Sequence, residues 1–430
     1  MSDINHRGYQ SRLEQLKRIL QQYNLQVSNI TPVAYQELGP CPYNNFIYKI
    51  ELSKPAESSV FRGPDQISNP CTTPPSDGAL VYILRMSNPE AMGINPRASR
   101  IENEVAAMFL ARKGLDNFQA GLGDLVPSIY AFCSKPSLPG DLPWALVEYK
   151  VGVPLDEFFD SQSEVRRESI IEQVSDVISG LQNCPLPPGV DSYGGLGVAK
   201  DGIISAEMTI TRGGPWSTYE MLLKARLEHE LHDADMSPVI KGWQENGVRQ
   251  RLQSLIDKFK LSVPEQKALV HGDLTMNNML INPETSKLTA LLDFDFASIA
   301  HPVHEFLVSL QDLGCNIMGP YGEDPTNGKL SQALLSGNFS ADIPGDLWWN
   351  GRTLNADLVK RGMQRPSDMV GIEVLFQWRA LEQLICPFHL AAPFIIHRLT
   401  DEQREEARKK AESELIDQME VLDKSISAVL

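Results

Sequence analysis

Alternating apolar and polar residues mark the first third of the chain as rich in β-strands. Helical spacing in this part is confined to residues 11–24 and 101–113. The stretch 54–78 is rich in Pro, Ser and Gly, which is typical of an exposed insertion loop. The period-two pattern predicts four strands, at residues 46–52, 79–86, 125–132 and 143–150.

Beyond these strands the apolar spacing changes to that of amphipathic helices. The last helix is predicted to begin at Thr400, where Gln403 completes a capping box. Earlier helical patterns cover residues 170–181, 217–231, 240–260, 302–313 and 369–385. The sequence therefore predicts an α+β protein, with a small β-rich N-terminal lobe at 1–147 and a larger helical C-terminal lobe at 148–430.

Composition and charge narrow the class of protein. Hydrophobic residues make up 42% of the 430 residues and charged residues 22%, which is ordinary for a globular protein. The formal net charge of −16 argues against a nucleic-acid-binding surface. The N-terminus lacks the apolar core of a signal peptide, and no apolar run approaches the roughly 20 residues of a membrane span. We therefore expect a soluble protein with no nucleic-acid or membrane partner.

The six cysteines are scattered along the chain and form no C-x-x-C pair. This spacing fits neither a disulfide framework nor a zinc site, and it suits a reducing compartment. We expect a cytoplasmic location.

One stretch, LVHGDLTMNNMLINPETSKLTALLDFDF, gathers polar residues that could carry chemistry. It contains Asp273, Asn278 five residues later, and Asp293 at the end of an apolar run. The two apolar segments 279–281 and 288–292 flank a turn sequence, so we predict a β-hairpin. Such a hairpin would bring Asn278 at one base close to Asp293 at the other.

These residue types suit phosphoryl transfer, which needs positioning and charge neutralisation. Asp273 could accept the proton of an attacking hydroxyl, as a catalytic base. Asn278 and Asp293 offer the hard oxygen ligands that Mg²⁺ prefers. The alternative is structural: a turn at Asp273 and an exposed acidic strand end at Asp293. We favour the functional interpretation, because all three residues occur together and the predicted hairpin lies between Asn278 and Asp293.

Arg85, near the end of a predicted strand, and Glu104, on the apolar face of a predicted helix, form a candidate ion pair. A carboxylate on a core-facing stripe needs a partner, and Arg85 is the strand-borne cation nearby in sequence. Arg85 would grip the phosphates of a nucleotide, and Glu104 would hold it in place. The alternative is an ordinary salt bridge inside the lobe.

Two further segments are candidates for nucleotide contact. The loop that contains Gly39, Asn44 and Asn45 precedes a strand and could cover the phosphates with backbone N–H groups, although it lacks G-x-G-x-x-G. At the lobe boundary, the segment Glu148-Tyr149-Lys150 could meet the adenine through its backbone, an inference that rests on position alone.

Other motifs give weaker signals. No G-x-x-x-x-G-K-[ST] loop, G-x-S-x-G elbow or H-E-x-x-H motif occurs in the chain. His301 and His304 lie three residues apart at a predicted helix start, and we interpret them as structural. We interpret the glycine-rich segment 194–197 as a plain turn.

The motifs H-G-D-L with Asn278, and L-L-D-F ending at Phe294, resemble those of the aminoglycoside phosphotransferase-like kinases, which include choline and fructosamine kinases. The order of segments between residues 30 and 310 is similar to that family, and the 54–78 insertion is similar to fungal members. The resemblance implies a two-lobed, protein-kinase-like fold. It also implies Asp273 as base, Asn278 and Asp293 as Mg²⁺ ligands, and Glu104 as the helix glutamate. Arg85 stands where members of that family usually have a lysine.

The resemblance further implies that the chain binds ATP, with GTP as an open alternative. It also implies that the phosphate acceptor is a small hydroxyl-bearing molecule such as an amino-alcohol, an aminoglycoside or a sugar. Aromatic and acidic residues in 216–235 and 372–389 would suit a cationic acceptor. The alternative is that they belong to the core and to solvated faces. A second hypothesis is a nucleotide-binding pseudokinase or scaffold in which Arg85 marks lost catalysis. Monomer and homodimer both remain open.

Overall fold

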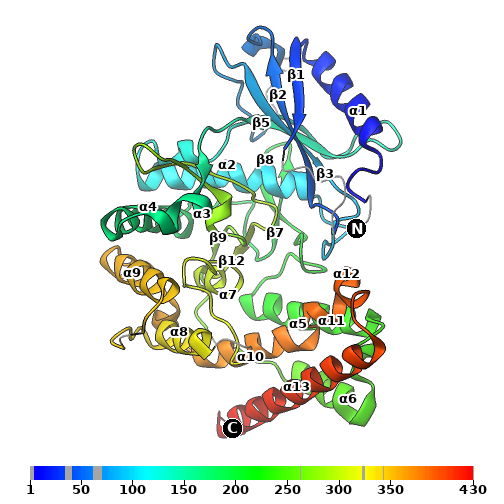
Figure 1. Ribbon diagram of the computed structural model, residues 1–430, viewed down its shortest axis with the longest axis vertical. Coiled ribbons are helices and arrows are strands. Elements are labelled where there is room, and N and C mark those ends of the chain that lie inside the picture. Colours follow the sequence, from blue (N-terminus) through cyan, green and yellow to red (C-terminus); the bar gives the residue numbers. More distant parts are fainter. Residues whose placement is uncertain are drawn as a thin grey trace. The chain divides into compact units, whose positions relative to one another are not determined.

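The computed structural model describes residues 4–33, 41–61, 70–261, 263–321, 325–341 and 343–429 (Figure 1). Contacts divide the chain into two compact units. The first comprises Met1–Ile210 with Ala268–Ile299, and the second comprises Thr211–Lys267 with Ala300–Leu430. These contact-defined units differ from the predicted lobes, whose boundary at 147/148 stays a prediction.

The first unit contains a five-stranded antiparallel sheet with strand order β1-β2-β3-β5-β4. All four strands expected from the alternation are present, and the edge strand β1 adds a fifth. The pattern did not reveal β1 because it is largely exposed and therefore lacks an apolar face. The strand bounds are β1 (Val27–Pro32), β2 (Asn45–Leu52), β3 (Val81–Ser87), β4 (Ile129–Cys133) and β5 (Trp144–Glu148).

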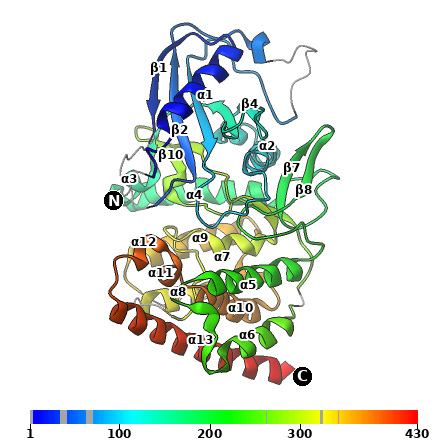
Figure 2. The same ribbon diagram turned by 90° about the vertical axis from the view of Figure 1, so that its right-hand side faces the viewer.

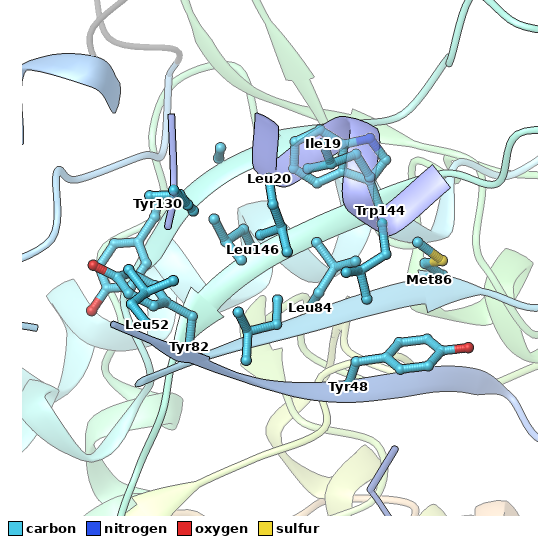
Figure 3. Packing of buried hydrophobic residues seen from close by; sticks show 14 of the residues in the cluster. Ile19, Leu20, Tyr48, Leu52, Tyr82, Leu84, Met86, Tyr130, Trp144 and Leu146 are labelled. Atoms are coloured by element: carbon cyan, nitrogen blue, oxygen red, sulfur yellow. The ribbon is translucent and has the colours of Figure 1, made fainter. Parts of the chain in front are cut away.

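Helix α1 (Tyr9–Gln22) covers one face of this sheet (Figure 2). Its Leu16, Ile19 and Leu20 belong to one buried core with apolar side chains of β2, β3 and β5. Figure 3 shows Ile19 and Leu20 beside side chains of these strands. Strand side chains alternate between faces, so the fully buried Leu84 and Met86 belong to this core. Arg85, which lies between them, therefore points to the opposite face.

Helix α2 (Arg100–Phe118) carries Glu104 and is longer than the predicted 101–113. Its N-cap is Ser99, whose hydroxyl accepts a hydrogen bond from the Glu102 N–H. Helix α2 packs against α4 (Glu164–Gln182), which contains the predicted helix 170–181.

The predicted hairpin is present as β10 (Met279–Asn282) and β11 (Lys287–Leu291), with Met279 opposite Leu291. Strand β6 (Val153–Pro154) extends it on the β10 side. The other elements of this part are short: η1 (Ser58–Phe61), η2 (Leu122–Leu125), α3 (Leu155–Phe158), η3 (Phe159–Ser161), β7 (Gly195–Ala199), β8 (Gly202–Ala206), β9 (Ala268–Val270), η6 (Met276–Asn278) and β12 (Ser298–Ala300).

The second unit is helical. Helix α10 packs on α5 and on the long helix α13, whose predicted capping box is present. The bounds are α5 (Tyr219–Met236), η4 (Lys241–Trp243), η5 (Glu245–Gly247), α6 (Val248–Asp257), η7 (Pro302–His304), α7 (Glu305–Val308), α8 (Pro325–Ser336), α9 (Asp346–Lys360), η8 (Pro366–Asp368), α10 (Ile372–Ile385), α11 (Phe388–Ala391), α12 (Pro393–Ile396) and α13 (Asp401–Val429).

Three local predictions were wrong. The segment 194–197 enters β7, which pairs with β8 in a hairpin, and is not a plain turn. The helix predicted at 302–313 ends at Val308, because Leu310 adopts a positive φ of 68°. In 240–260 the regular helix begins only after Gly247, itself at a positive φ of 71°.

No helix among the described residues is both long and apolar enough to span a membrane. All six cysteines are free thiols.

Candidate active site

The loop before the hairpin requires a glycine at position 272. Gly272 has a φ of 81°, and a Cβ atom there would lie 2.4 Å from the backbone oxygen of Phe296. Both the backbone conformation and the close approach exclude a side chain. The local backbone therefore accounts for the glycine between His271 and Asp273.

His271 is fully buried and links the loop to the end of the hairpin. Its Nε2 is 2.9 Å from the Leu292 oxygen, and its Nδ1 accepts a hydrogen bond from the Asp273 N–H. Burial lowers the pKa of His271 to about 4, against the opposing effect of Asp293. A neutral ring with Nε2–H as donor satisfies both contacts, so His271 is a structural link.

Asp273 and Asn278 are joined directly. The Asn278 Nδ2 donates to the Asp273 backbone oxygen at 2.8 Å and to its Oδ2 at 2.9 Å. Burial raises the pKa of Asp273; the Asn278 hydrogen bond opposes this rise, and the nearby Asp293 and Asp295 add to it. A raised pKa brings the carboxylate closer to the range in which a base works at neutral pH.

Asp293 follows β11 in a strained conformation, with a φ of 62°. Such a backbone is uncommon for a residue other than glycine and often marks functional sites. The Leu292 N–H donates to the Asn278 backbone oxygen at 2.8 Å, which fixes the two bases of the hairpin against each other. The structure thus brings Asp273, Asn278 and Asp293 to one end of the hairpin.

Arg85 and Glu104 form the ion pair expected from the sequence, with Nη1 2.8 Å from Oε1. The Arg85 Nη2 also donates to the Asp293 Oδ1 at 3.0 Å. Burial alone would lower the pKa of Arg85, but the three nearby carboxylates keep it above its usual value. Conversely, burial would raise the pKa of Asp293, but the charge and hydrogen bond of Arg85, together with His271 and a backbone hydrogen bond from Asp295, lower it.

Asp295 and Arg100 also belong to this cluster; the sequence indicated no fixed role for Asp295 and did not single out Arg100. The Asp295 Oδ2 lies 2.8 Å from Arg100 Nη2 and accepts a hydrogen bond from Asn45 Nδ2. No motif spacing marks Arg100, and Asp295 stood out only as the third residue of Asp-Phe-Asp. Their proximity depends on the packing of α2 against the segment after β11.

The oxygen-rich donor set fits a divalent cation. The Asp293 carboxylate is partly exposed, and the Asn278 amide uses its nitrogen toward Asp273, so that its oxygen is available as a ligand. Glu104, Asp293 and Asp295 each also have a carboxylate oxygen within 4.8 Å of the others. In this structure the guanidinium of Arg85 lies among these three carboxylates.

The predicted phosphate loop is described only in part. Gly39 lies outside the described residues. Asn44 accepts a backbone hydrogen bond from Asn88 at 3.0 Å, and the Asn45 side chain is turned to Asp295. The Asn45 amide therefore serves the carboxylate cluster in this structure.

At the end of β5 the side chains of the predicted adenine-binding segment are engaged with neighbours. Glu148 accepts from the Ser128 N–H and from Lys150, both within 2.9 Å, and the Tyr149 ring lies 5.1 Å from Lys49 Nζ. The Glu148 N–H also donates to the Ser128 oxygen at 2.8 Å, and contact of this segment with a nucleotide base stays a prediction.

His301 and His304 take structural roles within the second unit. His301 caps η7 through a hydrogen bond from the Val303 N–H, and His304 Nδ1 lies 2.9 Å from the Tyr219 hydroxyl. Both rings are buried.

The segments suggested for the acceptor also contain core residues. The buried Trp378 packs edge-on against Phe259, with ring centroids 4.7 Å apart. Glu382 forms ion pairs with Arg226 and Arg379. These two residues are therefore explained by packing and pairing inside the helical unit.

The chain is similar to known proteins over much of its length. A family model described as "Phosphotransferase enzyme family" matches residues 76–325, more than half of the chain. Acyl-CoA dehydrogenase family member 11 of Rattus norvegicus is 22% identical over 230 residues, or 53% of this chain, and family member 10 of Mus musculus is 26% identical over 211 residues, or 48%. The matches cover 25% and 16% of those proteins, so the chain spans only a part of their length.

Among solved structures, a proposed aminoglycoside phosphotransferase from Ralstonia eutropha is 14% identical, with a TM-score of 0.48. The match covers 96% of this chain and 98% of that one. The family match includes β3, α2 and the whole β10–β11 hairpin. The chain belongs to the phosphotransferase enzyme family.

Proposed function

We propose that the chain is an ATP-dependent O-phosphotransferase that acts on a hydroxyl group of a small molecule. The observation that carries this proposal is the convergence of Asp273, Asn278 and Asp293 at one end of the hairpin, with Arg85 in contact with Asp293. A turn or an exposed strand end would not need a buried arginine from another strand.

In this proposal Asp273 is the catalytic base. The acceptor oxygen forms a bond to the γ-phosphorus of ATP, the bond between that phosphorus and the bridging oxygen of ADP breaks, and Asp273 takes the hydroxyl proton. Asn278 orients the Asp273 carboxylate through its Nδ2. The raised pKa of Asp273 supports this role, because a more basic carboxylate accepts the proton more readily.

Arg85, held by Glu104, would bind phosphate oxygens, as a planar guanidinium can do with two donors at once. Asn278 and Asp293 would hold Mg²⁺, which supplies charge neutralisation at the phosphates when bound. Backbone groups of Asn44 and of the segment 148–150 remain proposed contacts of the nucleotide. The same site would bind GTP if the segment that contacts the nucleotide base accepts guanine in place of adenine.

For the acceptor we propose an amino-alcohol, an aminoglycoside or a sugar-like molecule. The net charge of −16 supports the cationic members of this group. The family match supports phosphoryl transfer and leaves the acceptor open.

A second candidate is a nucleotide-binding protein without turnover. The observation that favours it is the hydrogen bond from Arg85 to Asp293, which occupies a proposed metal ligand. The two candidates differ in whether Asp273 matters: turnover requires it, whereas nucleotide binding does not.

The test is release of ADP from Mg-ATP in the presence of amino-alcohols, aminoglycosides and sugars. We expect at least one acceptor to stimulate release, and Asp273→Ala to reduce it by about 10²–10⁴-fold without loss of nucleotide binding. The exposed Asp191, changed to Ala, is the matched control and should keep full activity. Stimulation that survives Asp273→Ala would contradict the proposed base. Nucleotide binding without any stimulated turnover would favour the second candidate.

A further inference from the structure

The guanidinium of Arg85 is shared unequally among three carboxylates. Nη1 lies 2.8 Å from Glu104 Oε1, while Nη2 lies 3.0 Å from Asp293 Oδ1 and 3.7 Å from Asp295 Oδ2. Glu104 thus holds one side of the fork, and two aspartates lie close to the other side. The closer of the two, Asp293, is also the proposed metal ligand.

The two aspartates differ in access and in how firmly they are held. The Asp293 side chain is 36% exposed, whereas that of Asp295 is 1% exposed. Asp295 is fixed by Arg100 at 2.8 Å and by Asn45, and Arg100 is itself buried and donates to the Asn88 backbone oxygen. Asp293 can therefore meet a metal ion from solvent, and Asp295 is enclosed by protein groups.

Five buried polar atoms of this cluster lack hydrogen bonds within the part of the chain that the structure describes, and they include both carboxylate oxygens of Glu104 and the Nε of Arg100. Arg85 Nε and Asp295 Oδ1 are both buried and have no hydrogen-bond partner among the described residues. Buried polar groups are usually paired, because an unpaired one loses its water without compensation. The buried Asp295 Oδ1 can accept a further hydrogen bond, and Arg85 would supply the donor if its guanidinium turned toward Asp295.

The balance of charge favours the same arrangement. Glu104, Asp293 and Asp295 carry three negative charges when ionised, against the two positive charges of Arg85 and Arg100. A cation at Asp293 would compete with Arg85 for the same carboxylate, since both need its oxygen atoms. Asp295 is the carboxylate to which Arg85 can turn without leaving Glu104.

We propose that Asp295 is a positioning residue for Arg85, and that it retains the guanidinium in the site when Asp293 binds a metal ion. This inference rests on the proposed function, because it assumes that Arg85 contacts nucleotide phosphates. It also gives a physical reason for an arginine at position 85. A planar fork can keep one nitrogen on Glu104 while the other moves between two aspartates, whereas a lysine presents a single nitrogen.

The experiment measures binding of a non-hydrolysable ATP analogue by calorimetry, once with MgCl₂ and once with EDTA. We expect Asp295→Asn to weaken binding about tenfold or more with MgCl₂, because Arg85 then loses both aspartates. With EDTA the loss should stay below about threefold, because Asp293 still holds Arg85. In the Arg85→Gln background, Asp295→Asn should have no further metal-dependent effect.

A purely structural role for Asp295 would weaken binding equally with MgCl₂ and with EDTA, and this result would overturn the proposal. Additive effects of Arg85→Gln and Asp295→Asn would overturn it as well. If the unmutated protein binds no analogue under either condition, the proposed function itself fails and the inference falls with it. The exposed Asp191→Asn is the control that should leave both affinities unchanged.

Asp295→Asn leaves Arg100 buried without its counter-charge, which could prevent folding. The combined change Asp295→Asn and Arg100→Gln removes both members of that buried pair and keeps polar groups of similar size. The same difference between the MgCl₂ and EDTA measurements is expected from this variant. If this variant folds but binds the analogue equally weakly with MgCl₂ and with EDTA, the proposal is contradicted.

Discussion

At the scale of single residues, the site depends on backbone conformations that few side chains tolerate. Gly272 has a φ of 81° beside the Phe296 oxygen, and Asp293 has a φ of 62°. The glycine removes a steric conflict, whereas Asp293 retains its carboxylate in a strained position. Strain of this kind persists only where the surrounding contacts hold it, as His271 and the hairpin do here.

We predict that Gly272→Ala destabilises the first unit by about 2–5 kcal/mol, since the positive φ and the clash with the Phe296 oxygen add together. Gly121→Ala is the matched control: its φ is 85°, but nothing lies within 4 Å of the added Cβ. The control should lose only about 1–2 kcal/mol. Urea unfolding of both variants measures the difference, and equal losses would show that the clash is relieved at no cost.

At the scale of elements, paired helices position charges that a single helix could not. In the second unit, Glu382 on α10 accepts from Arg226 on α5 at 3.0 and 2.6 Å, and from Arg379 at 2.8 Å. Burial would raise the pKa of Glu382, but the two arginines outweigh it and lower the pKa to about 2. The helix pair therefore keeps a buried carboxylate ionised.

We predict that Glu382→Gln destabilises the second unit by about 3–5 kcal/mol, because it leaves two buried arginines without their counter-charge. The control is Asp423→Asn, which removes a more exposed ion pair with Arg251 at 2.9 Å and should cost at most about 1 kcal/mol. Chemical unfolding followed by helical circular dichroism measures both. A loss as small as that of the control would mean that water or a rearranged acid replaces Glu382.

At the scale of the whole molecule, stability depends on the protons that the folded and unfolded chains bind. Burial lowers the pKa of His271 and of His301 to about 4, against about 6.5 in an unfolded chain. Between these values the unfolded chain binds protons that the folded chain excludes, so these residues reduce stability as pH falls from about 6.5 toward 4. Glu230 acts in the opposite direction, because burial raises its pKa to about 7.

A variant isolates one histidine from these opposing groups. His301→Asn keeps an acceptor for the Val303 N–H, since asparagine is a good N-cap, and removes the titrating ring. Relative to the unmutated protein, we expect it to gain about 2 kcal/mol of stability between pH 7 and pH 5. Urea midpoints at the two pH values test this. The exposed His397→Asn is the control, and a difference for His301→Asn that is constant with pH would contradict the assigned pKa.

Apolar patterns over short stretches of the sequence were sufficient to predict many of the helices and strands. Alternation marked β2, whose buried positions alternate, and short apolar runs marked β3, β4 and β5, which are buried at successive positions. Helical spacing marked α2, α4, α5 and α10. The pattern missed the exposed edge strand β1 and the helices α8 and α9. It also extended the helix after Pro302 too far, since the positive φ of Leu310 is not encoded in apolar spacing.

The sequence by itself determined the β10–β11 hairpin, because Asn278, the turn and Asp293 are close in the chain and the turn fixes which residues of the two strands pair. It also pointed to Arg85 and Glu104, through the single rule that a core-facing carboxylate needs a partner. Only the tertiary structure decided that Arg85 reaches Asp293, and that Arg100 and Asn45 enclose Asp295. Those contacts join residues about 200 positions apart or more, and their geometry depends on how α2 and the sheet pack.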